Sequence, residues 1–394
     1  MTISFHEDIR ALADEIIERR RDLHRHPELA FEETRTAGMV ARELQNLGLE
    51  VQAGVGKTGV VGLLEGDQDG PTLLVRADMD ALPIHEANQT DYVSTADGKM
   101  HACGHDGHTS IGLAVARVLS QRRSEMHGRI KFVFQPAEEV GKGALAMIDD
   151  GVLTNPHPAA SIGLHLWNDL PVGQVSVTPG PTMSAADDWN CVITGYGGHG
   201  AAPHQTRDPI VAAAQIISAI QTITSRNVSP LDTAVVTVGT IHGGDAFNII
   251  PASVEMRGTI RTYLPETKQM VHRRMGEIID GIAHSMGCEA DLTIDQMTLA
   301  VDNDIAISDR IAALAEEIVG AKNVRRDVRT MGSEDMSYLM DDIPGCYFFV
   351  GSANAERDLA YPHHNPRFDI DEEALLIGAE LLAKAAASFV IPGD

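Results

Sequence analysis

Three short apolar segments that alternate with helical patterns constrain the fold of this chain most. The segments are Thr72–Val75 ("TLLV"), Ile130–Phe134 ("IKFVF") and Ala160–Leu164 ("ASIGL"), and helical patterns cover Thr109–Arg122 and Gly143–Asp149. Continuously apolar strands that alternate with helices predict a largely parallel sheet covered on both faces. Polar residues follow each segment directly: "RADMD", "QPAEE" and "HLWND". Because ligands bind beyond the carboxyl ends of such strands, these three loops are expected to converge on one site.

A change in the pattern near Val177–Asp187 indicates a second domain. The order that follows, strand-helix-strand-strand-helix-strand, is that of the split ferredoxin-like unit. Its expected elements are Trp189–Tyr196, Pro209–Ser225, Ala234–Thr240, Ile249–Thr262, Glu266–Met286 and Glu289–Ile294. The other expected elements are helices at Ile9–His26, Glu32–Leu47, from Asp304 and from Asp371, and a strand at Gly345–Gly351. We therefore predict an α/β fold: a mostly parallel-sheet catalytic domain, 1–181 and 296–394, with an inserted ferredoxin-like α+β domain, 182–295.

The charge and composition of the chain argue against several partners and locations. With 394 residues, 43% of them hydrophobic, the chain is long enough for two domains and a large core. Its 31 basic and 56 acidic residues give a net charge of −25, which argues against nucleic acid and anionic membranes as partners. The chain has no run of about 18 apolar residues, so no membrane span is expected. Its charged N-terminal segment does not resemble a signal peptide. The four scattered cysteines are typical of a cytoplasmic protein.

Residue types that bind metals gather in the expected loops. "MHACGHDGHT" (100–109) contains Cys103 and His105, with Gly104 between them to let the backbone turn so that both face one site. Glu138 and Glu139 are adjacent at a strand end, and adjacent side chains are expected to point apart. One carboxylate would then bind a metal while the other holds a water molecule. Thiolate, imidazole and carboxylate are the ligands that zinc-like ions take.

Histidines near the later strands add to this set. His165 follows the third apolar segment, and His363-His364 precedes the closing helix. Taken singly, a histidine is usually a core or surface residue, a glutamate pair is usually solvated, and Cys103 alone would be a small buried hydrophobe. The convergence of these residues on one sheet edge favours a metal site instead.

A series of motifs along nearly the whole chain resembles a known family. The motifs are "DLHRHPELAFEE" (22–33), "RADMDALP" (76–83), "MHACGHDGHT" (100–109), "QPAEE" (135–139), "GLHLW" (163–167), "GGHGAAPH" (197–204), "FNIIP" (247–251), "SED" (333–335) and "HHN" (363–365). In this order and combination they resemble the amidohydrolase branch of the aminoacylase/carboxypeptidase metallopeptidase family, which includes hippurate hydrolases and indole-acetyl-amino-acid hydrolases. The resemblance implies hydrolysis of the amide bond of N-acyl amino acids, such as N-acetyl or N-benzoyl amino acids, to a carboxylic acid and a free amino acid.

The resemblance also implies two divalent metal ions per subunit, Zn²⁺ or Mn²⁺ first, with Ni²⁺ or Co²⁺ as alternatives. Cys103 would bridge them as a thiolate. The other implied ligands are His105, Glu139, His165 and His364. The family usually has a His-x-Asp motif where this chain has Asp78-Met79-Asp80. Asp78 is therefore not expected to be a ligand, and Asp80 is expected to orient one. Five ligands for two ions leave room for water and substrate, which is typical of a catalytic site.

Further roles follow from the same resemblance. Glu138 would accept the proton of a water molecule and deliver it to the leaving nitrogen. His199 would donate a hydrogen bond to the oxyanion, from its own or a partner's subunit; the alternative is that its glycine-rich segment is merely a turn. Asn248 and Arg261 would hold the substrate carboxylate, for which a guanidinium is a bidentate match, and Arg257 is a competing choice. The inserted domain would act as a lid and join a homodimer or higher homo-oligomer.

Smaller expectations concern the remaining polar residues. Ser333 is expected to cap the helix that follows it, with a substrate contact by Glu334 as an alternative. Six histidines without an assigned role are expected to pack or to form supporting hydrogen bonds: His24, His26, His101, His108, His204 and His363.

Three functions remain open from the sequence. The first is a metal-dependent amidohydrolase of N-acyl amino acids. The second is a metallo-dipeptidase or aminopeptidase of the same family, which would need an acidic residue for the free amine of its substrate. The third is a non-catalytic binding protein, against which the complete set of implied ligands and Glu138 argue.

Overall fold

The protein, described here by a computed structural model for residues 4–392, consists of two compact units. Within these residues, the first unit runs to Thr182 and resumes over Val301–Arg329 and from Asp335. The second unit comprises Met183–Ala300 and the short segment Thr330–Glu334. The sequence pattern assigns all of 296–394 to the catalytic domain, whereas the structure groups 296–300 and 330–334 with the second unit.

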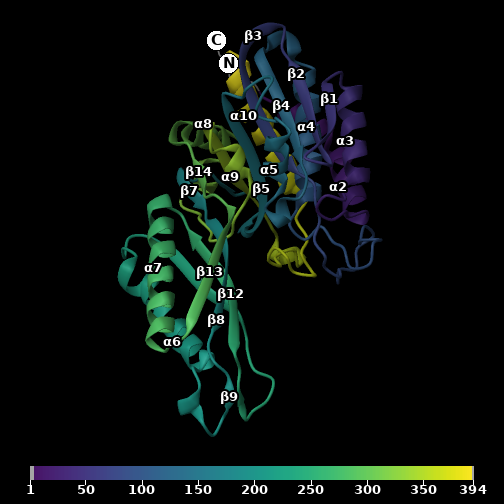
Figure 1. Ribbon diagram of the computed structural model, residues 1–394. Coiled ribbons are helices and arrows are strands. Elements are labelled where there is room, and N and C mark those ends of the chain that lie inside the picture. The colour runs from purple at the N-terminus through teal and green to yellow at the C-terminus, as the bar shows by residue number, and fades with distance from the viewer. Residues whose placement is uncertain (1–3, 393–394) are drawn as a thin grey trace. The chain divides into compact units, whose positions relative to one another are not determined.

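An eight-stranded sheet forms the centre of the first unit (Figure 1). Its order is β1 (Glu50–Val55), β2 (Gly59–Glu65), β4 (His127–Gln135), β3 (Gln68–Asp78), β5 (Ala160–Pro171), β16 (Gly345–Ala353), β6 (Val175–Ser176) and β15 (Val324–Arg325). The four central strands, β4, β3, β5 and β16, are parallel, while β1 and β2 add an antiparallel edge. The predicted mostly parallel sheet is confirmed.

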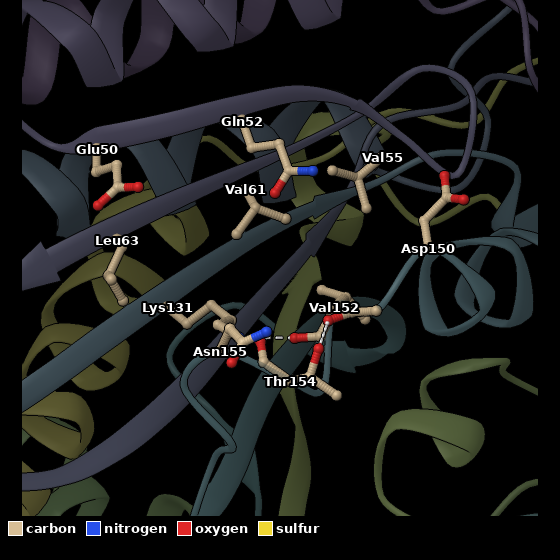
Figure 2. A pocket seen from close by; sticks show the side chains of 11 residues that line it. Glu50, Gln52, Val55, Val61, Leu63, Lys131, Asp150, Val152, Thr154 and Asn155 are labelled. Carbon is tan, nitrogen blue, oxygen red and sulfur yellow. Dashed lines mark hydrogen bonds between the residues drawn. The ribbon is translucent and has the colours of Figure 1, made fainter.

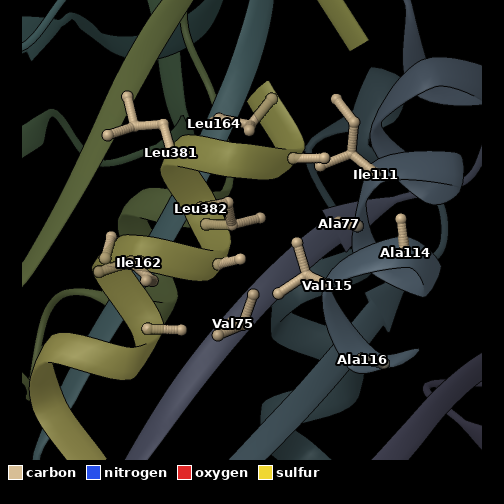
Figure 3. Close-up of a cluster of buried hydrophobic side chains, with 14 of the residues drawn as sticks. Val75, Ala77, Ile111, Ala114, Val115, Ala116, Ile162, Leu164, Leu381 and Leu382 are labelled. Atoms are coloured by element: carbon tan, nitrogen blue, oxygen red, sulfur yellow. The ribbon is translucent and has the colours of Figure 1, made fainter. Parts of the chain in front are cut away.

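Long helices cover one face of this sheet. They are α3 (Thr34–Asn46), α4 (His105–Ser120), α8 (Ile305–Val319) and α10 (Glu373–Val390), and α2 (Ala13–Arg25) packs on α4 and α10. Figure 3 shows side chains of α4 and α10 meeting those of β3 and β5, among them Val115, Leu381, Val75 and Ile162, all at most 2% exposed. Burying one such side chain stabilises the fold by about 1.5–3 kcal/mol. This core fixes α4, whose first residue belongs to the candidate site.

The other face of the sheet follows from the alternation of side chains along β4. Ile130 and Phe132 join the core described above, so Lys131 and Gln135 point to the opposite face. The short helices α5 (Gly143–Asp149) and α9 (Met336–Leu339) contact each other. Gln135 donates a hydrogen bond of 2.6 Å to Asp335, the residue before α9. The sheet is therefore covered on both faces, as the continuously apolar strands predicted.

The second unit is a four-stranded antiparallel sheet with two helices. In chain order its elements are β8 (Ala185–Thr194), α6 (Pro209–Thr222), β10 (Ala234–His242), β12 (Ser253–Thr262), α7 (Pro265–Ser285) and β13 (Glu289–Thr298). The strand order β10-β12-β8-β13 is that of the predicted ferredoxin-like unit. Trp189, Ile216 and Met275 lie in its separate core.

One predicted strand of this unit, Ile249–Thr262, is divided in two. β11 (Ile249–Ile250) pairs with β9 (Gly198–His199) in a small sheet of its own, and β12 begins after Pro251. Proline lacks the N–H that a continuous ladder needs. This division matters for function, because it brings the "FNIIP" segment beside the "GGHG" segment.

The remaining elements are short. They are α1 (His6–Ala11), β7 (Gly180–Met183), β14 (Val301–Asn303), a π-helical turn (Ile223–Asn227) and 3-10 turns at Arg123–Glu125, Glu138–Val140, Pro203–Gln205, Ala321–Asn323 and Ala355–Arg357. None of the described helices combines the length and the hydropathy that a membrane crossing needs.

Candidate metal centre and active site

Cys103 and His105 are placed by the start of helix α4. Gly104, the residue before the helix, has φ +90°, a left-handed conformation that glycine adopts without strain. The turn brings both side chains into the interior, where Cys103 is 8% exposed and His105 fully buried. His105 Nδ1 lies 2.9 Å from the backbone oxygen of Asp80, so this nitrogen carries the proton and donates it. The other ring nitrogen, Nε2, is thereby left as a potential metal ligand.

The Cys103 thiol is shared by two groups of potential ligands. One group is Cys103, His105 and His165, and the other is Cys103, Glu139 and His364; within each group the ligand atoms lie within 4.8 Å of one another. Cys103 Sγ is 3.5 Å from His165 Nε2. The structure thus brings together all five residues that the resemblance implies as ligands, with the cysteine common to both sets.

His165 lies inside a strand rather than after one. β5 continues to Pro171, so the expectation that the strand ends at Leu164 is wrong. However, β3 pairs with β5 only as far as Gly163, which leaves the His165 side chain at an edge that β3 no longer covers. His165 Nδ1 donates to the Leu166 carbonyl at 2.7 Å, and Nε2 faces Cys103. Burial lowers the pKa of His165, which keeps the ring neutral, the form that binds metals.

The loop before α10 contributes His364. Its backbone N–H donates to the Ala102 carbonyl at 2.8 Å, which fastens this loop to the Cys103 loop. Its φ of +65° is left-handed, a conformation that costs free energy in a residue other than glycine and that clusters at functional sites. His364 Nε2 is 3.4 Å from Glu139 Oε2.

The two adjacent glutamates do not point apart. Glu138 Oε2 and Glu139 Oε1 each lie 3.9 Å from His105 Nε2, so both carboxylates face the same centre. The expectation of diverging side chains holds for an extended strand, whereas Glu138–Val140 form a 3-10 turn. The Asp80 carboxylate fastens this turn: Oδ1 accepts from Glu138 N at 3.0 Å and Oδ2 from Glu139 N at 3.1 Å. Asp80 thus orients both glutamates and, through its backbone oxygen, His105.

Asp78 and His108 also lie near His105, but their polar atoms are occupied. Asp78 accepts from Arg76 Nη1 at 2.6 Å on one oxygen and from His108 Nδ1 at 2.6 Å on the other. His108 Nε2 in turn accepts from Leu166 N at 2.9 Å. The ligand atoms of both residues lie within 4.8 Å of those of His105, but these hydrogen bonds already engage them, and neither groups with Cys103.

The donors around His105 fit a bound cation. His105 Nε2 and Glu139 Oε1 are buried and have no hydrogen-bond partner, which is costly for polar atoms unless an ion satisfies them. Burial lowers the pKa of His105, but the surrounding carboxylates, Asp78 first, outweigh it and raise the pKa to about 10. Burial raises the pKa of Glu139 to about 7. A divalent ion would relieve both the excess of negative charge and the unsatisfied atoms.

The other candidate residues belong to the second unit. His199 and Asn248 are exposed, and they are neighbours because Gly200 N donates to the Asn248 carbonyl at 2.8 Å. His199 Nδ1 accepts from Ala201 N at 3.0 Å, so the neutral ring carries its proton on Nε2. His199 can therefore donate a hydrogen bond from Nε2, because the Ala201 amide contacts only Nδ1.

Arg261 has a partner that the sequence did not reveal. It is half-buried on β12, and its Nη1 donates to Ser333 Oγ at 2.6 Å. The expectation that Ser333 caps the following helix is wrong, since no side chain caps α9. The competing Arg257 is exposed and lies 3.4 Å from Asp188, as a surface ion pair does. The only sequence signal for Ser333 was its place in the "SED" motif.

The segment around Ser333 is bound to the second unit at several points. Tyr263 OH donates to the Thr330 carbonyl at 3.0 Å, and Ser184 Oγ donates to the Met331 carbonyl at 2.8 Å. These contacts explain why Thr330–Glu334 belongs to the second unit, although this segment lies 30 or more residues beyond Ala300 in the chain. Such a contact between distant segments leaves no periodic pattern in a sequence.

The hollow in Figure 2 is not the candidate site. It is a small cavity of about 70 Å³ between β1, β2 and the segment after α5. Burial lowers the pKa of Lys131 to about 8, and its ammonium donates three 2.8 Å hydrogen bonds to the carbonyls of Val152, Thr154 and Pro156. The lysine therefore serves to hold this segment, and none of the candidate site residues lines the cavity.

Comparisons with known proteins identify the family of the chain. Residues 74–388 match the model of peptidase family M20/M25/M40. The N-acetylcysteine deacetylase of Bacillus subtilis is 39% identical over 96% of this chain and 97% of its own length. The Arabidopsis thaliana protein named IAA-amino acid hydrolase ILR1-like 4 is 38% identical over 94% of this chain and 85% of its own. Among solved structures, the YXEP protein of Bacillus subtilis, described as a dinuclear metal-binding peptidase from the M20 family, is 35% identical with a TM-score of 0.83, covering 96% of this chain and 98% of that one.

Proposed function

The chain belongs to peptidase family M20/M25/M40 and hydrolyses the amide bond of N-acyl amino acids, and we propose that it does so with two divalent metal ions and the residues named below. The family that the sequence motifs resemble is thereby confirmed. The observation that carries the proposal is the pair of ligand groups that share Cys103, next to a second carboxylate, Glu138, which groups with His105 and Glu139 but not with Cys103.

The ligands of the two ions are Cys103, His105, Glu139, His165 and His364. Cys103, present in both groups, would hold both ions as a thiolate. When bound, the ions acidify a water molecule and polarise the carbonyl of the scissile amide. A mixed sulfur, nitrogen and oxygen set suits Zn²⁺ or Mn²⁺, with Ni²⁺ and Co²⁺ as alternatives.

Glu138 is the general base in this proposal. Its carboxylate faces the metal centre beside His105. Of the two glutamates, however, only Glu139 belongs to the ligand group of Cys103 and His364. Glu138 takes the proton from the attacking water and transfers it to the leaving nitrogen. Asp80 holds the backbone of both glutamates and so fixes where the proton is taken up.

His199 supplies a hydrogen bond to the oxyanion. Its Nε2–H is available because Nδ1 is engaged by Ala201, which is the tautomer that a donor requires. Asn248 lies beside it and, with Arg261, binds the carboxylate of the amino-acid part of the substrate. Ser333 holds one end of the Arg261 guanidinium, which leaves the other nitrogens for this carboxylate.

A homodimer or higher oligomer is part of the proposal. Four large apolar side chains of the second unit are exposed, Phe247, Tyr196, Ile249 and Ile241, at 104%, 61%, 58% and 47%, and their burial would favour association. A partner subunit could then supply His199 to the site of its neighbour. A cytoplasmic location, inferred from the scattered cysteines, remains a prediction of the sequence.

A screen of substrates tests the function. The metal-loaded protein is assayed with N-acetyl, N-benzoyl and indole-acetyl amino acids, with the matching methyl esters and amides, and with dipeptides. The proposal expects turnover of the acylated acids and weak binding of derivatives that lack the free carboxylate. Faster cleavage of dipeptides would favour the alternative, a metallo-dipeptidase or aminopeptidase.

A further inference from the structure

A fully buried carboxylate, Glu33, lies behind the glutamate turn of the candidate site and has no role so far. Glu33 Oε1 accepts two backbone hydrogen bonds, from Phe31 N at 3.0 Å and from Ala137 N at 2.9 Å. Its other oxygen accepts from the Thr58 hydroxyl. The Glu33 side chain is 0% exposed. One carboxylate thus joins three segments that are far apart in the sequence.

Both backbone amides on Glu33 Oε1 belong to strained residues. Phe31 has φ +63° and Ala137 has φ +52°, left-handed conformations that residues with a Cβ rarely adopt. Such conformations persist only where the surrounding structure holds them, and they gather at functional sites. A single oxygen receives the amides of both residues, and at Ala137 it acts together with the hydrogen bond of 3.1 Å from Gly143 N to the Ala137 carbonyl.

The conformation of Ala137 decides where the two glutamates point. Ala137 immediately precedes the 3-10 turn of Glu138 and Glu139, and its left-handed φ turns the chain out of the direction of β4. The amides of all three consecutive residues bind buried carboxylates: Ala137 binds Glu33, and the two glutamates bind Asp80. If Ala137 relaxed to an ordinary extended or helical conformation, the next two side chains would be redirected.

We propose that Glu33 is a positioning residue for the hydrolysis: by holding Ala137 in its left-handed conformation, it places the Glu138 carboxylate at the metal centre. The proposal rests on the proposed function of Glu138. The Glu33 carboxylate binds Phe31, Ala137 and Thr58, none of which is a proposed metal ligand, so its effect is on the geometry of the proton transfer.

Three substitutions at Glu33 separate the hydrogen bonds from the charge. Glu33→Ala removes the acceptor, and Glu33→Asp keeps the charge but shortens the side chain by one methylene, which withdraws it from Ala137. Each is expected to lower kcat about 100-fold with little change in KM, because a misplacement of about 1 Å has a cost of that order. Glu33→Gln keeps an oxygen for both amides and should lose less than about tenfold.

A second substitution tests the link to Ala137 directly. Glycine adopts a left-handed conformation without strain, so Ala137→Gly lowers the need for an acceptor. In the Glu33→Ala background, Ala137→Gly is expected to restore kcat by about tenfold, whereas alone it should leave kcat nearly unchanged. A purely stabilising role of Glu33 predicts no such rescue, since glycine adds no contact.

Thr58→Val is the matched control. It removes the third hydrogen bond to the same carboxylate and leaves the amide of Ala137 bound, so kcat should stay near that of the wild type. Metal content is measured by mass spectrometry, the fold by thermal unfolding, and the turn by amide hydrogen exchange of residues 137–140 in the metal-free protein. Faster exchange is expected in Glu33→Ala and Glu33→Asp, and unchanged exchange in Thr58→Val.

The outcomes distinguish this proposal from the proposed function. If Glu138→Gln is inactive while folded Glu33→Ala and Glu33→Asp keep wild-type kcat and exchange, the positioning role is refuted and the function stands. The positioning role would also be overturned if Thr58→Val lost as much kcat as Glu33→Ala, or if Ala137→Gly did not restore kcat in the Glu33→Ala background. If Glu138→Gln itself remains active, the proposed function fails first.

Discussion

Replacing Glu138 by glutamine is expected to remove most turnover while the fold and the metal ligands stay in place. Glutamine has nearly the size of glutamate, and the hydrogen bond of 3.0 Å from residue 138 to Asp80 comes from the backbone and is kept. The amide cannot take up the proton of the attacking water. A general base contributes about 10²- to 10⁴-fold, which corresponds to a barrier about 2.7–5.4 kcal/mol higher at about 1.36 kcal/mol per decade.

Glu139 provides a matched control in the same turn. Its carboxylate lies at the same 3.9 Å from His105 Nε2 as that of Glu138, so proximity to His105 does not separate the two roles. What separates them is His364, whose Nε2 is 3.4 Å from Glu139. Glu139→Gln is therefore expected to lower the metal content, whereas Glu138→Gln should bind both ions.

Three measurements decide the outcome for this pair. Single-turnover kinetics with an N-acetyl amino acid give the rate of the chemical step, mass spectrometry gives the number of ions per chain, and thermal unfolding reports the fold. The reasoning is refuted if Glu138→Gln binds two ions and its single-turnover rate stays within about tenfold of the wild type, less than the smallest loss expected of a general base.

Further predictions concern the other parts of the site. Cys103→Ala should lose metal and activity, whereas alanine at each of the other three cysteines should leave metal binding unchanged, as titration of the metal-free protein would show. Because the pKa of His105 is raised to about 10, its proton stabilises the metal-free fold fully below about pH 6.5 and this stabilisation is lost as the pH rises through 10. Metal binding must displace that proton, so calorimetry in buffers of different ionisation enthalpy should show proton release and an affinity that rises with pH. His199→Ala should lower turnover about 10²- to 10³-fold at normal metal content. If His199 acts across subunits, mixing His199→Ala with Glu138→Gln subunits should restore part of the activity. If no activity returns after subunit exchange has been proven, His199 acts in the site of its own subunit. Ser333→Ala should raise KM about three- to tenfold for substrates with a free carboxylate and not for their amides, since one hydrogen bond to Arg261 is lost.

The sequence by itself determined the architecture and indicated the chemistry of the candidate ligands. Apolar runs of strand length between helical patterns specify a covered parallel sheet, because burial on both faces requires uninterrupted apolar side chains. The same local rule placed polar loops at the strand ends, and the spacing of Cys103 and His105 around a glycine already implied a tight turn. Signals of this kind act over a few residues, so they can be recognised in the sequence alone.

Only the tertiary structure decided how these residues are aimed. The two glutamates converge because Ala137 is left-handed and its amide meets Glu33, more than 100 residues earlier in the chain. Likewise, Arg261 meets Ser333 across 72 residues, where the sequence suggested only a helix cap. The physical reason is that hydrogen bonds between distant segments depend on where the packed core places each backbone, and no periodicity or propensity records that placement.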